Sequence, residues 1–333
     1  MMTEAFVGVA LTGTGSAVPS TVLTNDDLAR VVQTSDEWIS SRTGIHERRL
    51  LNPDESLTSL AVKAGARALE AAGLAATELD LILLATSTAD DRFGNATRVQ
   101  HELGAKWSVA FDLTAACSGF IFGLVTAAQF IRTGTYRNIL LIGADALSHW
   151  IDWSDRRTCV LFGDGAGAVV IQNNREDRLL GFQLCSDGSH HHHLNIGCQA
   201  QPHSLTSEVS IGQEVFSPIT MNGKEVYRFV MRTVPEVIDK VLYHSGVSTN
   251  ELDWLLLHQA NQRILDAVAL RLEIPLHKVV SNLQNYGNTS AASIPLALDE
   301  SVRQGQIQSG HLIATSGFGA GLTWGAAVFY WGT

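Results

Sequence analysis

The chain has 333 residues, a formal net charge of −10 and 45% hydrophobic residues. This length and composition allow a large buried core, as one domain or as two similar halves, and they exclude intrinsic disorder. The acidic balance argues against general nucleic-acid binding. No apolar run reaches the roughly eighteen residues that a membrane-spanning helix needs.

The N-terminal residues and the cysteines indicate a cytoplasmic location. Glu4 and Gly8 interrupt the pattern of a secretory signal peptide, which needs positive charge followed by an unbroken apolar stretch. Four cysteines without a CxxC pair are too few for a disulfide-stapled scaffold. We therefore expect a protein of the reducing cytoplasm.

Predicted strands and helices alternate along the chain, which is typical of a layered α/β fold. The predicted elements of the first half, in chain order, are a strand at Phe6–Leu11, a short helix capped by Thr24 or Asn25, a helix at Glu55–Ala72, strands at Leu79–Thr86 and Trp107–Asp112, a helix at Cys117–Phe130, and strands at Asn138–Ala144 and Ala166–Ile171. The helix ending at Ala72 has apolar residues on one face and is followed by Gly73, a frequent helix stop.

An internal repeat indicates that the chain arose by duplication. The segment Gly73–Leu84 resembles Gly246–Leu257 at an offset of 173 residues, which is 246 minus 73. The same offset maps the strand Ile139–Ile142 onto Leu312–Thr315. Chance explains one such match in an α/β protein more easily than several matches at one offset.

The repeat predicts two similar halves, at residues 1–174 and 175–333, packed about a pseudo-twofold axis. Applied to the strand-to-helix turns, the offset of 173 pairs Cys117 with Ser290. We expect these equivalent turns to meet near the axis.

Cys117 is a candidate nucleophile. It follows the strand that ends at Asp112, after a turn of small residues and before an apolar helix. A thiol at a helix N-terminus lies at the positive end of the helix dipole, which predicts a lowered thiol pKa and a reactive thiolate. The alternative is a buried structural cysteine, which is the usual state of a free one.

His258 and Asn288 are candidate partners of the cysteine. His258 follows the apolar strand Trp254–Leu257, and Asn288 lies in a polar turn that opens a helix. Taken alone, His258 also fits a satisfied buried polar group, and Asn288 an ordinary helix cap. The repeat favours a functional role, because it places both residues near the cysteine turn.

Two glycine-rich stretches differ in what they predict. Gly163–Gly167 precedes a strand rather than a helix, so it does not fit a dinucleotide-binding loop and indicates a tight turn with close backbone packing. Ser316–Gly321 follows a strand and is able to present a backbone N–H to an oxyanion, although a plain loop fits equally well.

The run His190–His193 does not predict a metal site. Four consecutive histidines cannot all face one ion, and no carboxylate or cysteine cluster flanks them at ligand spacing. A solvated loop is the simpler interpretation. We expect the remaining cysteines to be inert; they are Cys159, Cys185 and Cys198.

Three motifs together resemble the β-ketoacyl-[acyl-carrier-protein] synthase III family of the thiolase superfamily. They are Ala116–Gly119, His258–Asn261 and Gly287–Ser290, and they are supported by Thr34–Ile39, Arg42–Ile45 and Phe162–Ala168. The resemblance covers essentially the whole chain. It implies a five-layered αβαβα thiolase fold, a homodimer, and a multifunctional enzyme that initiates type II fatty acid synthesis.

The resemblance also implies the reaction, in which acetyl-CoA and malonyl-carrier protein give acetoacetyl-carrier protein, CoA and carbon dioxide. Cys117 is the implied nucleophile, with the backbone N–H groups of Cys117 and Ala320 as the oxyanion hole. His258 and Asn288 are implied to stabilise the enolate formed on decarboxylation. No metal and no cofactor are implied.

Further residues are implied to bind the substrates. Trp38 and Arg156 match positions that sandwich the CoA adenine, Arg42 a nearby CoA contact, Asn261 a residue of the pantetheine tunnel, and Phe93 the end of the acyl pocket of the partner subunit. Gln259, Arg263 and Arg228 match carrier-protein contacts, and Arg271 would extend their basic rim. Ordinary solvated charge is the alternative for these arginines. Two departures are Ala320, where a glycine often occurs, and Arg157, where a small residue is common.

Other functions on the same fold remain open to different degrees. A starter synthase for a secondary metabolite, or an acyltransferase that uses Cys117 without condensation, fits the same residues. Thiolases carry a second cysteine where this chain has Asn288, elongating synthases use two histidines, and a hydroxymethylglutaryl-CoA-type synthase needs a glutamate where Asp90 and Asp91 lie in a different motif. A non-catalytic partner subunit would lack the nucleophile. The motifs leave the primer's length and branching and any feedback regulation open.

Overall fold

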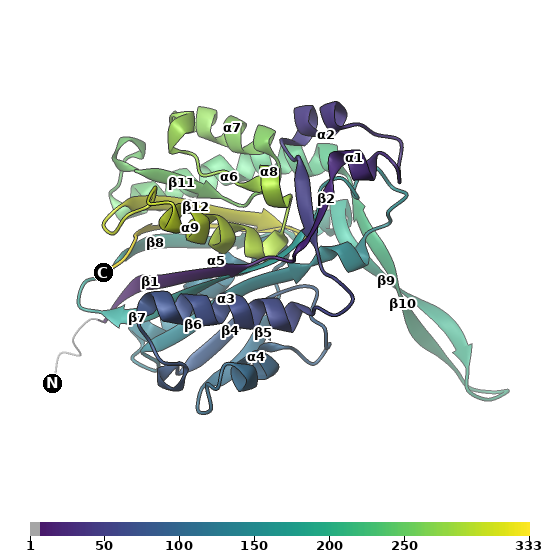
Figure 1. Cartoon of the computed structure of the whole chain (residues 1–333), viewed down its shortest axis with the longest axis horizontal. Coiled ribbons are helices and arrows are strands. Elements are labelled where there is room, and N and C mark those ends of the chain that lie inside the picture. Colours follow the sequence, from purple (N-terminus) through teal and green to yellow (C-terminus); the bar gives the residue numbers. More distant parts are fainter. Residues whose placement is uncertain (1–6) are drawn as a thin grey trace.

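A computed structural model describes residues 7–333 of the chain (Figure 1). The first sheet consists of β1 (Gly8–Ala17), β4 (Leu81–Ala85), β5 (Val109–Leu113), β6 (Asn138–Ala146) and β7 (Asp164–Asn174). Its strand order is β1-β7-β6-β4-β5. β4 runs parallel to β5 and β6, and β7 runs antiparallel to both of its neighbours.

The second sheet repeats this topology. It consists of β8 (Leu179–Ser186), β11 (Trp254–Leu257), β12 (Leu312–Gly319) and β13 (Thr323–Tyr330), in the order β11-β12-β13-β8. β11 is parallel to β12, and β13 is antiparallel to β12 and β8. In the first sheet β5 pairs with β4. At the equivalent edge of the second sheet, β11 makes only a single parallel bridge, between Leu255 and Val279.

Helices cover both sheets and fill the space between them. They are α3 (Leu57–Ala72), α4 (Ala96–Glu102), α5 (Gly119–Arg132), α6 (Gly223–Ser245), α7 (Gln262–Arg271) and α9 (Ser293–Arg303). α3 and α4 pack on the outer face of the first sheet, α6 and α7 on the outer side of the second, and α5 and α9 lie between the sheets (Figure 1). This arrangement confirms the predicted five-layered αβαβα thiolase fold.

The other elements lie around the ends of the sheets. They are β2 (Thr21–Thr24), α1 (Asn25–Leu28), α2 (Asp36–Thr43), β3 (Glu47–Leu50), α8 (Leu283–Tyr286) and the hairpin of β9 (Leu194–Ser204) and β10 (Ser210–Met221), which projects from the body in Figure 1. Short 3-10 turns occupy Ala76–Glu78, Ala116–Ser118, Leu147–Trp150, Gly188–His193, Thr249–Glu251, Leu276–Lys278 and Ser290–Ala292. No helix within residues 7–333 has the length and apolarity to cross a bilayer.

The predicted elements are present, with shifted ends. α3 begins at Leu57 rather than at residue 55, because the Ser56 hydroxyl accepts the N–H of Ser59 and caps the helix, and it ends at Gly73 with φ 63°. Thr24 caps α1 as expected. The predicted start of the first strand, Phe6, lies outside the described residues.

The offset of 173 holds between β4 and β11 but not at the turn that carries Cys117. In the first sheet Leu81 pairs with Ile139, and in the second sheet Trp254 pairs with Ile313, so the offset has grown to 174 at the second strand. The left-handed backbone of Ala116, with φ 48°, recurs at Ser290, with φ 52°. Cys117 therefore corresponds to Ala291.

The pairing of Cys117 with Ser290 was thus wrong by one residue, and so was the mapping of Ile139–Ile142 onto Leu312–Thr315. Loops between equivalent strands tolerate insertions, so an offset measured on one strand need not hold beyond the next loop. The chain passes from the first sheet to the second between Asn174 and Leu179. The division into halves at residues 1–174 and 175–333 stays a prediction.

Candidate active site

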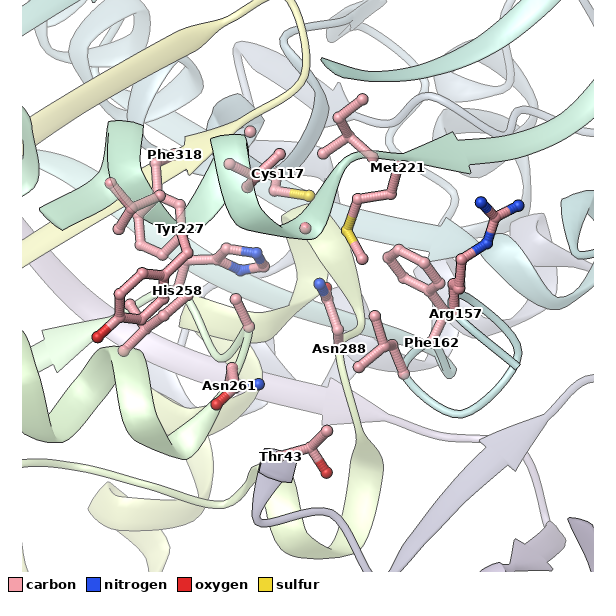
Figure 2. Close-up of a pocket in the computed structure, with 18 of the residues that line it drawn as sticks. Thr43, Cys117, Arg157, Phe162, Met221, Tyr227, His258, Asn261, Asn288 and Phe318 are labelled. Atoms are coloured by element: carbon pink, nitrogen blue, oxygen red, sulfur yellow. The ribbon is translucent and has the colours of Figure 1, made fainter. Parts of the chain in front are cut away.

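Cys117, His258 and Asn288 line one cavity of about 240 Å³. They come from the turn Ala116–Ser118, from the residue after β11, and from the turn before Ser290–Ala292. All three are buried, with exposed fractions of 7%, 1% and 7%. Figure 2 shows the sulfur, the imidazole and the carboxamide facing the same space from three different segments.

Cys117 lies on a strained turn between the two halves. Ala116 before it has positive φ, which is unfavourable for a residue with a Cβ and is typical of functional turns. β12 passes directly beside the cysteine, since a side-chain carbon at Gly319 would lie 2.8 Å from the Cys117 nitrogen. A larger residue at 319 would displace Cys117.

The expected lowering of the Cys117 pKa was wrong. Burial raises the pKa of the Cys117 thiol to about 12, while a hydrogen bond with the Ser290 hydroxyl lowers it and the charge of Asp145 raises it further. The desolvation of a buried thiolate outweighs the dipole of α5, which begins only at Gly119. The resting residue is therefore a thiol.

A buried carboxyl that the motifs did not indicate joins the segment after β4 to the turn Ser290–Ala292. Asp145 accepts hydrogen bonds from the Ser87 N–H at 2.8 Å and from the Ala291 N–H at 3.2 Å, and burial raises its pKa. A side chain at Gly143, two residues earlier on β6, would overlap the Ala291 carbonyl. The only signal for Asp145 in the sequence was its place directly after an apolar strand.

His258 is held as a neutral hydrogen-bond donor. Its Nδ1 lies 2.7 Å from Ser293 Oγ, which also accepts the N–H of Gln259 at 3.4 Å. Within residues 7–333 Nδ1 is the only acceptor in reach of the Ser293 hydroxyl, so the ring proton belongs on Nε2. Burial lowers the pKa of His258 to about 3. Sequence reasoning missed Ser293, although it follows Asn288 by five positions.

Asn288 is oriented by its own turn. Its Oδ1 accepts the N–H of Ser290 at 2.9 Å, which leaves the NH₂ group free to face the cavity. Its backbone is held by the segment that precedes β7: Asn288 N donates to Leu161 O at 2.8 Å, and Gly163 N donates to Asn288 O at 3.0 Å. The site therefore contains two N–H donors from different elements.

The glycines after Phe162 permit this close approach. A side chain at Gly163 would overlap the carbonyl oxygen of Tyr286, and one at Gly167 would overlap the backbone nitrogen of Leu296 on α9. The predicted close backbone packing is confirmed. The segment is the beginning of β7 rather than a turn.

The mouth of the cavity carries an aromatic ring between cations. The guanidinium carbons of Arg42 and Arg156 lie 4.5 and 4.6 Å from the centre of the Trp38 ring, and Arg156 also donates to Gln33 O at 2.9 Å. Asn261 caps α7 through its Oδ1 and donates from Nδ2 to Arg42 O at 3.1 Å. The same cavity reaches Trp38, Arg42, Arg156, Arg157 and Asn261.

The residues expected to contact a carrier protein divide into two groups. Arg228, Arg263 and Arg271 are exposed, on α6 and α7; Arg228 pairs with Glu225, and Arg263 donates to Ser41 O at 2.8 Å. Gln259 is 1% exposed; its carboxamide donates to Leu257 O and accepts the N–H of Asn282. A contact of the Gln259 side chain with a carrier protein is excluded by this burial.

A second cavity, of about 400 Å³, also reaches Cys117. Its lining is mostly apolar and includes Ala320, beside which β12 ends, together with Leu147, Phe162, Leu194, Ile196 and Ile219. Phe93 is fully exposed and lines a neighbouring surface groove instead. The thiol thus stands at the junction of two cavities.

The histidine run forms the turn Gly188–His193, and one of its residues departs from the expected solvated loop. His191 is exposed but also lines the second cavity. Within residues 7–333 no group of three or more His, Cys, Asp or Glu side chains is placed to hold a metal ion. Cys159 is buried, Cys185 half-buried and Cys198 exposed, and all are free thiols.

Two family models match this chain. "3-Oxoacyl-[acyl-carrier-protein (ACP)] synthase III" matches residues 111–188, and the model of its C-terminal part matches residues 242–331. The first contains the cysteine turn, and the second contains both His258 and Asn288.

Relatives and solved structures agree with these models. Beta-ketoacyl-[acyl-carrier-protein] synthase III of Trichormus variabilis is 65% identical over 98% of this chain and 99% of its own length, and that of Synechococcus elongatus is 65% identical over 100% and 99%. The crystal structure of the Aquifex aeolicus synthase III superposes with a TM-score of 0.89 at 45% identity, over 97% of this chain and 100% of its own. A priming β-ketosynthase of the R1128 polyketide pathway has a TM-score of 0.90 at 32% identity, over 100% and 98%.

Sequence identity of about 65% over nearly the full length of this chain and of its relatives, together with the shared fold, assigns the chain to one family. The chain belongs to the β-ketoacyl-[acyl-carrier-protein] synthase III family and is an acyltransferase of fatty acid biosynthesis.

Proposed function

We propose that the protein catalyses a two-step decarboxylative condensation at Cys117. In the first step the sulfur of Cys117 bonds to the carbonyl carbon of a short acyl-CoA, and CoA leaves with the thiol proton. In the second step a malonyl thioester on the carrier protein loses carbon dioxide, and its α-carbon attacks the acyl carbon. The products are 3-oxoacyl-carrier protein and the Cys117 thiolate, which regains a proton.

The observation that carries this proposal is the pair of N–H donors beside the thiol. Decarboxylation builds negative charge on the malonyl thioester oxygen, and Nε2 of His258 with Nδ2 of Asn288 stabilise it. Both donors are preorganised, because Ser293 occupies Nδ1 of the histidine and Ser290 occupies Oδ1 of the asparagine. The N–H groups of Cys117 and Ala320 hold the other oxyanion, that of the acyl transfer.

The two cavities divide the substrate between them. The cavity with Trp38 at its mouth takes the CoA or carrier-linked pantetheine arm, and the apolar cavity takes the acyl chain. Arg156 moves off the Trp38 ring so that adenine stacks between them, with Arg42 nearby and Asn261 along the tunnel. This assignment places the thioester carbon at Cys117, where the cavities meet.

The charged rim supports an acidic carrier as the second substrate. Arg228, Arg263 and Arg271 stand exposed on neighbouring helices of a chain whose net charge is −10, and we assign to them the local positive surface that an acidic carrier needs. Neither step requires a metal or redox cofactor. Four free thiols are consistent with a cytoplasmic location.

A homodimer is supported by the edge of the first sheet. β5 is the last strand of that sheet, and the exposed apolar side chains near it include Phe93, Trp107, Val109 and Phe111. An unpaired, apolar strand edge favours pairing with another chain. In the dimer, Phe93 of each chain lies against the acyl-binding region of its partner.

Intact-protein mass spectrometry tests the proposal. Acetyl-CoA is expected to add one acetyl group to the wild-type protein and none to Cys117→Ser, and malonyl-carrier protein is expected to discharge it. A panel of longer and branched acyl-CoAs identifies the preferred primer. Absence of an adduct with every short acyl-CoA, or an adduct that malonyl-carrier protein does not remove, would contradict the proposed reaction.

A further inference from the structure

Arg48 on β3 is a completely buried cation without an anionic partner. Its exposed fraction is 0%, and none of the salt bridges within residues 7–333 includes it. Burial lowers the pKa of Arg48 to about 10, so the guanidinium stays charged at neutral pH. Burying an unpaired cation is unfavourable. This cost points to the hydrogen bonds of the guanidinium as the reason for its presence.

The guanidinium bonds three neutral oxygens on two separate parts of the chain. Its Nη1 donates to Leu23 O at 3.1 Å and to Asn25 Oδ1 at 2.8 Å. Its Nη2 donates to Val160 O at 2.8 Å. A planar group with fixed N–H directions is able to satisfy acceptors on both sides at once. Arg48 therefore connects the junction of β2 and α1 to the segment that precedes β7.

The segment that Arg48 holds is the one that holds Asn288. Leu161 follows Val160 directly, and its carbonyl accepts the N–H of Asn288 at 2.8 Å. Two residues later, Gly163 N donates to Asn288 O at 3.0 Å. Since consecutive carbonyls belong to one stiff stretch of backbone, fixing Val160 O also restricts the pairing with Asn288.

The aliphatic part of Arg48 packs against the same junction. A side-chain carbon at Gly163 would lie 3.1 Å from Cβ of Arg48, and one at Gly287 would lie 3.4 Å from it. Gly287 directly precedes Asn288 and has φ 65°, a conformation that favours glycine. Arg48 thus contacts both backbone strands of this pairing.

The other end of the connection is fixed as well. Asn25 is 1% exposed, and its Nδ2 donates to Asp36 Oδ1 and to Ile45 O, both at 2.8 Å. Asp36 is the first residue of α2, the helix that carries Trp38 at the mouth of the cavity. The anchor of Arg48 is therefore itself tied to the wall of the cavity.

We propose that Arg48 is a positioning residue for Asn288 in the decarboxylation step. Arg48 does not line the cavity, so it acts through the backbone of residues 160–163. A preorganised donor is effective only when it is held close to its productive position. The inference rests on the proposed function, because it takes Asn288 as a donor to the enolate. Arg48 lies outside every motif that carries the family resemblance.

The test is Arg48→Lys, which keeps the charge but replaces the planar group by a single ammonium. We expect decarboxylation of malonyl-carrier protein, measured as carbon dioxide release, to slow about tenfold. Acetylation of Cys117 by acetyl-CoA, measured by intact mass spectrometry, should change less than about twofold, because it does not use Asn288.

Arg49→Lys is the matched control, since it makes the same change at the next residue of β3. The Arg49 guanidinium pairs with Glu47 and makes no hydrogen bond to the segment before β7 within the described residues. Neither decarboxylation nor acetylation should change by more than about twofold.

Combining Arg48→Lys with the loss of each donor separates positioning from general damage. In His258→Ala, Arg48→Lys should still slow decarboxylation about tenfold. In Asn288→Ala it should have an effect below about twofold, because the group that it positions is gone. A packing defect would slow decarboxylation equally in both backgrounds and would overturn the proposal.

The wild-type protein separates this inference from the proposed function. If wild type is not acetylated and does not decarboxylate malonyl-carrier protein, the proposed function fails. If wild type does both, and Arg48→Lys slows both steps equally or neither, only the role of Arg48 is overturned. Should Arg48→Lys not fold, Asn25→Ala, which leaves the bond to Val160, allows the same comparison, with an expected loss of about threefold in decarboxylation alone.

Discussion

The two equivalent turns at the centre of the molecule have the same backbone but carry different residues. Ala116 and Ser290 share a left-handed conformation, each opens a 3-10 turn, and each turn leads into a helix of the middle layer. The first turn places the Cys117 thiol in a buried position that disfavours its charge. The second places Asn288 as a donor before the turn and Ala291 at the position of the cysteine.

The difference between the turns suggests that the two copies of the repeated segment took different roles. In the proposed mechanism one copy supplies the nucleophile, and the other supplies the groups that stabilise negative charge. Gly119 after the first turn corresponds to Ser293 after the second, at the offset of 174, and Ser293 holds the histidine. We therefore expect the two turns and the residues that contact them to differ in their effects on the reaction and on stability.

The largest effect is expected for the donors of the second half. His258→Ala and Asn288→Ala should each lower the rate of malonyl decarboxylation by about 10²–10³, because each removes one preorganised donor to the enolate. Acylation of Cys117 by acetyl-CoA should remain largely intact. Decarboxylation is followed by carbon dioxide release and acylation by mass. Loss of acylation alone in either variant would contradict the division of tasks.

The next effect concerns the first turn and pH. Because burial raises the pKa of Cys117 to about 12, little thiolate exists at neutral pH, and the fraction grows as pH rises. Alkylation of Cys117 by iodoacetamide should therefore increase about tenfold per pH unit from pH 7 to 10, whereas an ordinary cysteine levels off near its pKa of about 8.5. Peptide mass spectrometry separates Cys117 from the other thiols. A plateau below pH 8 would show that the turn lowers the thiol pKa.

A smaller effect is expected at the residue that follows the second turn. Ser293→Ala removes the donor to Nδ1 of His258, so the ring is free to change tautomer, and decarboxylation should slow about tenfold, which corresponds to about 1.4 kcal/mol. Ser293→Thr keeps the hydroxyl and should restore most of the rate. Equal loss in both variants, or loss of acylation as well, would indicate a packing effect rather than control of the tautomer.

The smallest effect concerns stability. Ala116→Gly removes the penalty of a left-handed alanine and should raise the free energy of unfolding by about 1 kcal/mol. Ser290→Gly relieves the same conformation but loses the hydroxyl that bonds Asp145, so it should lower that free energy by about 1 kcal/mol. Urea unfolding at one fixed protein concentration measures both. Equal shifts in the two variants would mean that the hydroxyl adds nothing.

The sequence alone was sufficient for the fold and for the identity of the three central side chains. The alternation of elements and the repeated segment predicted two α/β layers, and the motifs around Cys117, His258 and Asn288 carried the family resemblance. Each motif is local, so it can be read from neighbouring residues, and the repeat needs only a comparison of two stretches of sequence. The helix ends at Ser56 and Gly73 follow from the same local chemistry.

Only the tertiary structure decided the environment of those side chains. The raised pKa of Cys117, the clamp on Asn288, the support of His258 by Ser293 and the burial of Gln259 all arise where segments distant in sequence touch. The offset of the repeat failed at the turn because loop lengths changed between equivalent strands. Desolvation and contact depend on what packs around a residue, and a local motif does not record this.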